Sequence, residues 1–171
     1  MRSALDRLYA ASLWLGAFFL VLLLAMVLLG ILGRELGFHV RGTDAYAGYF
    51  MAASGFLALP ATLKRGEHIR VALVVDRLPA PWRRRAQLFA LAVGALLALL
   101  FAWFSVRMAW QSWQFNDIST ANDATPLWIP QIAMAVGAVV LLIAFIDEFL
   151  ITLRGGTAGS LSGQAREGSS V

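Results

Sequence analysis

Hydrophobic residues in this chain are gathered into four long runs that contain no charged residue. The runs extend over Leu8–Gly33, Ala45–Leu63, Ala86–Val106 and Ala124–Ile146, and none is shorter than 19 residues. About 20 apolar residues in a helix span the hydrocarbon core of a bilayer. No strand-like alternation occurs, and a segment in lipid must satisfy its own backbone hydrogen bonds, so the runs predict helices rather than a barrel.

We therefore predict an all-α membrane protein whose four transmembrane helices form a single domain at 1–154. The helices are expected at about 9–33, 45–63, 86–112 and 127–152. All four runs are long enough to cross, so an even number of crossings is expected to leave both termini on the same side of the membrane.

Two segments outside the runs have a different composition. Glu67–Pro79 is too short and too charged to span, and it is expected to lie on the cytoplasmic interface as a short helix. Residues 155–171 are rich in Gly and Ser and predict a flexible cytoplasmic tail. Pro60, near the cytoplasmic end of the second run, is expected to help end the span, with a kink in the helix as the alternative.

The composition agrees with a chain that uses lipid as its solvent. Of the 171 residues, 60% are hydrophobic and 14% are charged, and the mean hydropathy is +0.72. A soluble domain of this size does not have such a composition. The net charge of +4 does not indicate nucleic-acid binding, because the basic residues share no face with aromatic residues. With no cysteine, disulfides and thiolate chemistry are excluded.

The distribution of positive charge predicts the orientation. Of the 14 lysines and arginines, Arg34, Arg41 and Arg107 fall on one side of the four predicted helices, and the other 11 fall on the opposite side. Cytoplasmic connections retain Lys and Arg. Both termini and the connection between the second and third helices are therefore expected in the cytoplasm.

The middles of the four runs hold no ionisable residue, which argues against a proton-coupled pump built from this chain alone. The charged residues nearest to the runs are Asp44, Arg107, Asp147 and Glu148. All four stand at predicted helix ends, where we expect them to be solvated or snorkelling, with a contact to another subunit as the alternative.

No site for catalysis, metal or cofactor is predicted. His39 and His68 fall on opposite sides of the membrane in this topology, whereas a bis-histidine haem needs both in one layer. A nucleophile with a nearby base is also missing. The sequence therefore predicts a protein that is not an enzyme.

Small residues recur at helical spacing in two of the runs. In the second run they are Ala45, Gly48, Ala52 and Gly55, and in the third run and just after it they are Gly94, Ala98, Ala102, Ser105 and Ala109. Small residues permit close approach of helices in lipid. Each set is expected either to pack within the four helices or to receive another membrane subunit.

The connection between the second and third runs resembles that of a known family. Leu-Lys-Arg-Gly-Glu-His-Ile-Arg-Val at 63–71 and Asp-Arg-Leu-Pro at 76–79 are similar to the small membrane subunit of tripartite ATP-independent periplasmic (TRAP) transporters, the DctQ-like or Q component. Gly33-Arg34, Asp44 and Thr-Pro-Leu-Trp-Ile-Pro at 125–130 agree with this resemblance.

The resemblance covers about Arg2–Leu153 and implies a subunit of the bacterial inner membrane that scaffolds a large membrane subunit (the M component). A periplasmic solute-binding protein (the P component) would deliver an organic acid or similar solute for ion-gradient-driven uptake. Within this picture, Arg65, His68 and Arg70 are candidates for contact with the large subunit or with phospholipid. The candidates for contact with the periplasmic partner are Arg41, Asp44, Asp117 and Asp123.

Two other functions are compatible with four small helices. One is an anchor or assembly subunit of a membrane respiratory enzyme, which histidines at matched depth would favour. The other is a small self-assembling exporter, which would need a carboxylate within the first run, and Leu8–Gly33 contains none.

Overall fold

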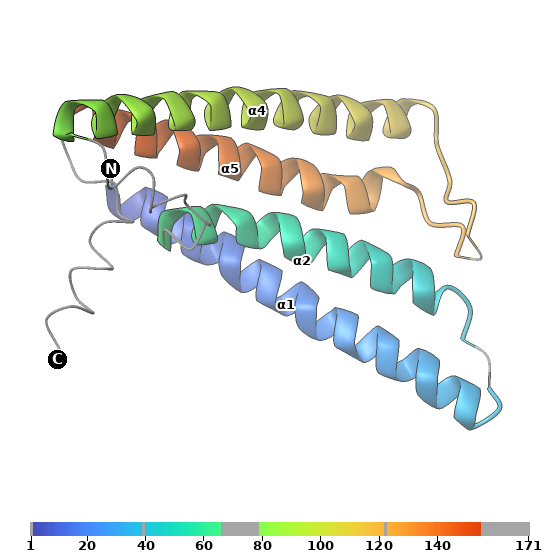
Figure 1. Ribbon diagram of the computed structural model, residues 1–171. Coiled ribbons are helices and arrows are strands. Elements are labelled where there is room, and N and C mark those ends of the chain that lie inside the picture. Colours follow the sequence, from blue (N-terminus) through green and yellow to red (C-terminus); the bar gives the residue numbers. More distant parts are fainter. Residues whose placement is uncertain (1, 39, 66–78, 122, 155–171) are drawn as a thin grey trace, which may run out of the picture.

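The computed structural model describes residues 2–38, 40–65, 79–121 and 123–154. Within these ranges the chain forms four helices (Figure 1), which are α1 (Arg2–Glu35), α2 (Thr43–Arg65), α4 (Ala80–Gln114) and α5 (Trp128–Leu153). The described residues form no sheet, and an isolated bridge joins Ile118 to Pro126. The predicted all-α class is confirmed.

Three of these helices are long and apolar enough to cross a membrane. They are the segments Ala4–Glu35, Trp82–Gln114 and Trp128–Leu153, which belong to α1, α4 and α5. The α2 helix is not among these three, and it carries Tyr46, Tyr49 and Ser54 between its charged ends. The structure thus supports three of the four predicted spans by length and composition.

The helices lie in a row rather than in a square bundle. Along this row α1 packs on α2, α2 on α5, and α5 on α4, whereas α1 meets α5 only slightly. Figure 1 shows the same order from α4 through α5 and α2 to α1. We call the end where α1 begins and α5 finishes the terminal end, and the opposite end, which holds the α1–α2 and α4–α5 connections, the hairpin end.

Glycines allow the neighbouring helices to approach closely. A Cβ added to Gly16 of α1 would lie 3.1 Å from the carbonyl oxygen of Ser54 on α2, and one added to Gly94 of α4 would lie 2.5 Å from the ring of Phe145 on α5. A side chain at Gly94 would require the Phe145 ring to move, and one at Gly16 would require α1 and α2 to separate by a few tenths of an ångström. Close contact of this kind is how helices associate in lipid.

The contact between α2 and α5 combines Pro60 with Gly137. Proline has no N–H to donate to the carbonyl four residues earlier, which belongs to Phe56. A Cβ added to Gly137 would lie 2.6 Å from this carbonyl oxygen. Because Gly137 has no side chain, the Phe56 carbonyl can lie against α5. The helix continues to Arg65. Pro60 therefore lies within α2 and does not end the helix.

The observed helix ends lie beyond several of the predicted ones. The third helix begins at Ala80, before Arg83–Arg85 and ahead of its predicted start at about 86, whereas the fourth ends at Leu153, close to its predicted end at about 152. Charged residues bound a hydrophobic run but do not interrupt helical hydrogen bonding outside hydrocarbon. Segment 66–78, which holds most of the predicted interfacial helix, and the tail at 155–171 lie outside the described residues.

The two sets of small residues have opposite environments. We call Gly94, Ala98, Ala102, Ser105 and Ala109 the α4 stripe, and Ala45, Gly48, Ala52 and Gly55 the α2 stripe. In the α4 stripe Ala98, Ala102 and Ser105 are buried, so this face packs inside the protein. In the α2 stripe Gly48, Ala52 and Gly55 are exposed, and no described atom lies within 4 Å of a Cβ added to either glycine.

Candidate functional site

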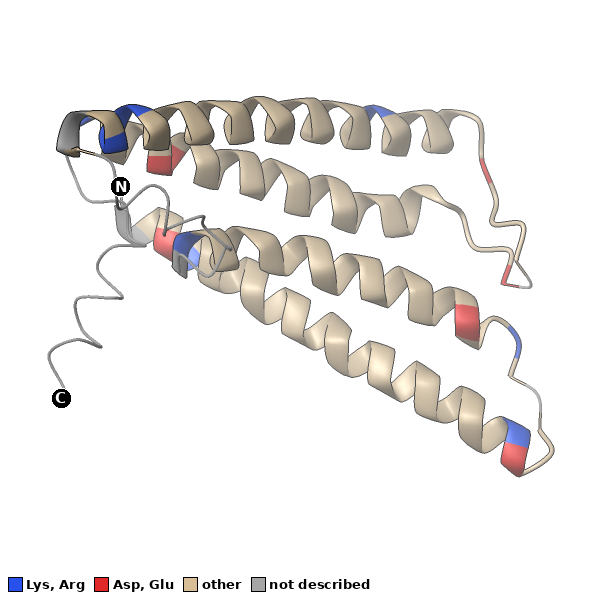
Figure 2. Cartoon of the chain, in the orientation of Figure 1, with Lys and Arg blue, Asp and Glu red and all other residues tan. Residues whose placement is uncertain are grey.

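Charged residues of the described helices lie near the terminal end and the hairpin end, and the middles of the helices carry none (Figure 2). At the terminal end, Lys64 of α2 meets Asp147 and Glu148 of α5. The Lys64 ammonium donates a hydrogen bond to Asp147 and lies 3.2 Å from Oε1 of Glu148. Glu148 is 3% exposed. One cation and two carboxylates thus join α2 to α5.

The first helix completes this site through Tyr9. The Lys64 nitrogen lies 5.3 Å from the centre of the Tyr9 ring, a distance suited to a cation–π contact. Tyr9 is buried and packs with Leu63, Val140 and Ala144. We call Tyr9, Lys64, Asp147 and Glu148 the charge cluster, and it brings α1, α2 and α5 together at one level.

The chemistry of the charge cluster is that of a structural ion pair. No group of three or more metal-binding side chains occurs among the residues that the structure describes. Oε2 of Glu148 and the hydroxyl of Tyr9 are buried and have no hydrogen-bond partner in the described chain. Removing one member of a buried pair leaves an uncompensated charge, which costs more than the pair itself contributes. The cluster therefore holds the three helices in register.

The charge cluster is not predicted by the sequence pattern. The expectation that Asp147 and Glu148 are solvated or snorkelling helix ends is wrong, because both pair with Lys64 and Glu148 is buried. The hydrophobic run ends at Leu63 and so places Lys64 in the following connection, although α2 includes it. A signal was present, since the predicted topology places the ends of the second and fourth helices on the same side.

A second polar site lies at the hairpin end, where α2 begins. The Tyr49 hydroxyl donates to Oδ2 of Asp123 at 3.1 Å and lies 2.9 Å from the Ser119 hydroxyl. Thr125 donates to the Tyr46 hydroxyl at 3.1 Å. We call Tyr46, Tyr49, Ser119, Asp123 and Thr125 the hydroxyl cluster. It ties α2 to the connection between α4 and α5.

Backbone geometry and electrostatics support the hydroxyl cluster. Gly42 has a φ of +81°, and a Cβ there would lie 2.8 Å from Cβ of Asp123, so only glycine suits this turn. Partial desolvation raises the pKa of Asp123, but the hydroxyls of Thr125, Ser119 and Tyr49 outweigh it and hold this pKa below its ordinary value. Asp123 is therefore a charged acceptor at neutral pH.

The residues predicted to contact a periplasmic partner differ in their exposure to solvent. Arg41, Asp44 and Asp117 are exposed at the hairpin end, whereas Asp123 is half-buried and engaged with Tyr49. The exposed three are accessible to another protein. Asp123 instead serves the chain's own fold.

The residues predicted to contact the large subunit or phospholipid are mostly outside the described chain. Arg65 is the last residue of α2, and its side chain is not described. His68, Arg70 and His39 lie outside the described residues. The predictions that involve these side chains remain predictions.

The sequence is similar to a family of known membrane proteins. It matches the model of the family described as "Tripartite ATP-independent periplasmic transporters, DctQ component" over residues 23–155. No curated protein matches the chain. The matched range runs from the middle of α1 to the end of α5 and includes both Lys64 and Glu148. The chain therefore belongs to the DctQ family and is the small membrane component of a TRAP transporter.

Proposed function

We propose that this small permease subunit is a static scaffold for the large membrane subunit during uptake of an organic acid or similar solute. Family membership implies a complex with a large membrane component (M) and a periplasmic binding component (P). The charge arrangement supports a scaffold, because the middles of the described helices hold no charge that a coupling ion would need. An ion gradient would then act on the partner.

The topology proposed for this role has four crossings and cytoplasmic termini. The α2 helix lies between α1 and α5 along the row, so a bilayer that contains its neighbours also surrounds α2. Ala45–Leu63 carries no charge over 19 residues. The terminal end is rich in Lys and Arg, which favours the cytoplasmic side for it.

The observation that carries the scaffold proposal is the open α2 stripe. A Cβ added to Gly48 or Gly55 would have no described atom within 4 Å. By contrast, a Cβ added to Gly16, Gly94 or Gly137 would contact the neighbouring helix. The side chain of Met51, beside the stripe, is 67% exposed. The family implies a large membrane partner, and a smooth face of this kind permits a helix of that partner to approach closely.

Co-purification of the large subunit tests this face. Leucine at both Gly48 and Gly55 places two bulky side chains on the α2 stripe, and we expect at least a tenfold loss of large subunit retained in mild detergent. The matched control is Ala92→Leu, at an exposed position of α4, which should retain the complex. Equal retention by both variants would reject α2 as the docking face.

The segment after α2 is proposed to brace the large subunit at the cytoplasmic side. Lys64 is anchored by Asp147 and Glu148, so the chain leaves the membrane at a fixed place. Arg65, His68 and Arg70 would contact lipid phosphates or acidic residues of the partner. An Arg65→Ala, His68→Ala double variant that leaves the complex intact would refute the brace without affecting the α2 interface.

A further inference from the structure

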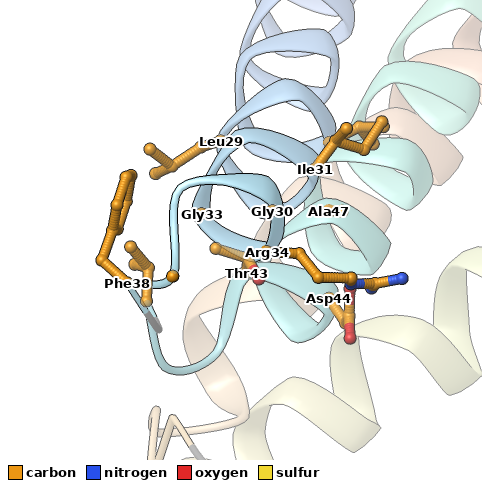
Figure 3. A pocket seen from close by; sticks show the side chains of 12 residues that line it. Leu29, Gly30, Ile31, Gly33, Arg34, Phe38, Thr43, Asp44 and Ala47 are labelled. Atoms are coloured by element: carbon orange, nitrogen blue, oxygen red, sulfur yellow. The ribbon is translucent and has the colours of Figure 1, made fainter.

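A cavity of about 500 Å³ opens between the end of α1 and the start of α2, at the hairpin end. Figure 3 shows the side chains that surround it. Its α1 wall includes Val27 and Ile31, its α2 wall includes Ala47, and two charged residues, Arg34 and Asp44, also line it. No site described above uses this cavity.

Small residues and a tight turn create the space. Gly30 and Gly33 of α1 and Ala47 of α2 line the cavity with little or no side chain. The Gly37 backbone has a φ of +74°, and the Phe38 N–H returns to the carbonyl of Gly33 at 2.9 Å. A left-handed glycine that closes a helix in this way reverses the chain direction. The turn therefore closes the cavity at the end where the chain passes from α1 to α2.

The cavity changes from apolar to charged along α1. Val27 and Ile31 are 43% and 51% exposed, and they belong to the uncharged run that ends at Gly33. Arg34 is the first charge after that run. One end of the cavity consequently faces hydrocarbon, and the other lies at the level of the lipid headgroups. A water-soluble ligand does not match this gradient, whereas a lipid does.

The two charges at the polar end have opposite signs and are accessible. Arg34 and Asp44 are exposed, and neither side chain has a hydrogen bond or ion pair with another described residue. In Figure 3 both side chains lie on the same side of the cavity, away from Leu29 and Phe38. The pair has no net charge, so it suits a headgroup that carries one negative and one positive charge.

We propose that this cavity binds phosphatidylethanolamine. The Arg34 guanidinium would donate to the phosphate, for which its planar fork is well suited. The primary ammonium would donate to the Asp44 carboxylate, and an acyl chain would follow Val27 and Ile31 into the hydrocarbon. Phosphatidylglycerol has no cation for Asp44, and the quaternary amine of phosphatidylcholine has no N–H to donate. The proposal does not depend on the scaffold role.

Lipid retention by the full-length chain tests this site. The chain is purified into detergent and mixed with equal amounts of phosphatidylethanolamine, phosphatidylglycerol and phosphatidylcholine, and retained lipid is counted by native mass spectrometry. We expect wild type to retain one phosphatidylethanolamine in preference to the other two. Arg34→Gln should reduce phospholipid retention about fivefold. Asp44→Asn should transfer the preference to phosphatidylglycerol, because Arg34 then acts alone.

Matched variants separate the cavity from general attraction to lipid. Arg107→Gln and Glu35→Gln remove charges at the same end of the molecule from residues that do not line the cavity, and both should bind as wild type. Ala47→Phe fills the cavity without changing charge and should also reduce retention. Equal retention of the three lipids by wild type would overturn the proposal, as would equal losses in Arg34→Gln and Arg107→Gln.

Discussion

The α2 stripe and the α4 stripe are similar in sequence and opposite in surroundings. Ala102 of the α4 stripe is 4% exposed, while Ala52 of the α2 stripe is exposed. The small side chains of the α4 stripe are covered by the protein's own α5, as the contact of Gly94 with Phe145 shows. Small residues therefore mark a face suited to close packing, and the arrangement of the helices decides whether that face is already occupied.

The row of helices explains the difference. The α4 helix is at the edge of the row, so it packs mainly on α5 and turns its small residues toward that helix, with a ring contact from Phe101 to Phe56 of α2. The α2 helix has neighbours on both sides and uses Leu57 and Pro60, which are fully buried, for its internal contacts. Its small residues remain on a third face. A helix with two neighbours and a further smooth face is able to accept another helix without repacking.

The largest expected effect comes from breaking the contact that keeps α2 on α5. Lys64→Met leaves the buried Glu148 carboxylate without its cation, and we expect the free energy of unfolding in detergent to fall by about 3 kcal/mol. Removing all three charges in Lys64→Met, Asp147→Asn, Glu148→Gln should recover at least half of this loss. If Lys64→Met unfolded like wild type, the charge cluster would not be holding the two helices together.

A matched pair of substitutions sharpens the comparison of the stripes. Ala102→Leu forces a larger side chain into the α4–α5 interface and should lower the free energy of unfolding of the isolated chain by about 1–3 kcal/mol. Ala52→Leu adds the same atoms to the open α2 stripe and should leave stability unchanged. Both are measured by denaturant unfolding in the same detergent. Equal destabilisation would show that α2 is covered within the chain itself.

The smallest expected effect is a dependence on pH at the hairpin end. The pKa of Asp123 is lower in the folded chain than its ordinary value of 3.8. Its contribution to stability is therefore complete above that value, and it is lost as the pH falls through the folded pKa. Melting temperatures of wild type and Asp123→Asn should differ at pH 7 and converge in acid. A constant difference would exclude this carboxylate as the cause.

The helices and the family could be predicted from the sequence, because both depend on local patterns. Four uncharged runs gave four helices, and residues 63–71 carried the family resemblance. Contacts between distant residues were less accessible. Lys64 and Glu148 are 84 positions apart in the sequence, and their pairing required knowing that α2 packs on α5. The sign of charge at a helix end does not reveal whether that end is buried.

The environments of the stripes could not be predicted for a related reason. A spacing of three and four residues places small side chains on one face of a helix, but it does not say which neighbour that face meets. In water, exposed apolar residues would have indicated the outer surface. In lipid that signal is lost, because lipid-facing and protein-facing residues are both apolar.

The most direct test of the scaffold role is cross-linking from single cysteines in native membranes. The chain contains no cysteine, so Ala52→Cys and Ala102→Cys each carry a single thiol for a photoreactive group, with exposed Ala25→Cys on α1 as a lipid-facing control. We predict a covalent adduct with the large membrane subunit from position 52 and none from positions 25 and 102. An adduct from position 25 with none from position 52 would contradict the assignment of the α2 stripe as the face that receives the large subunit.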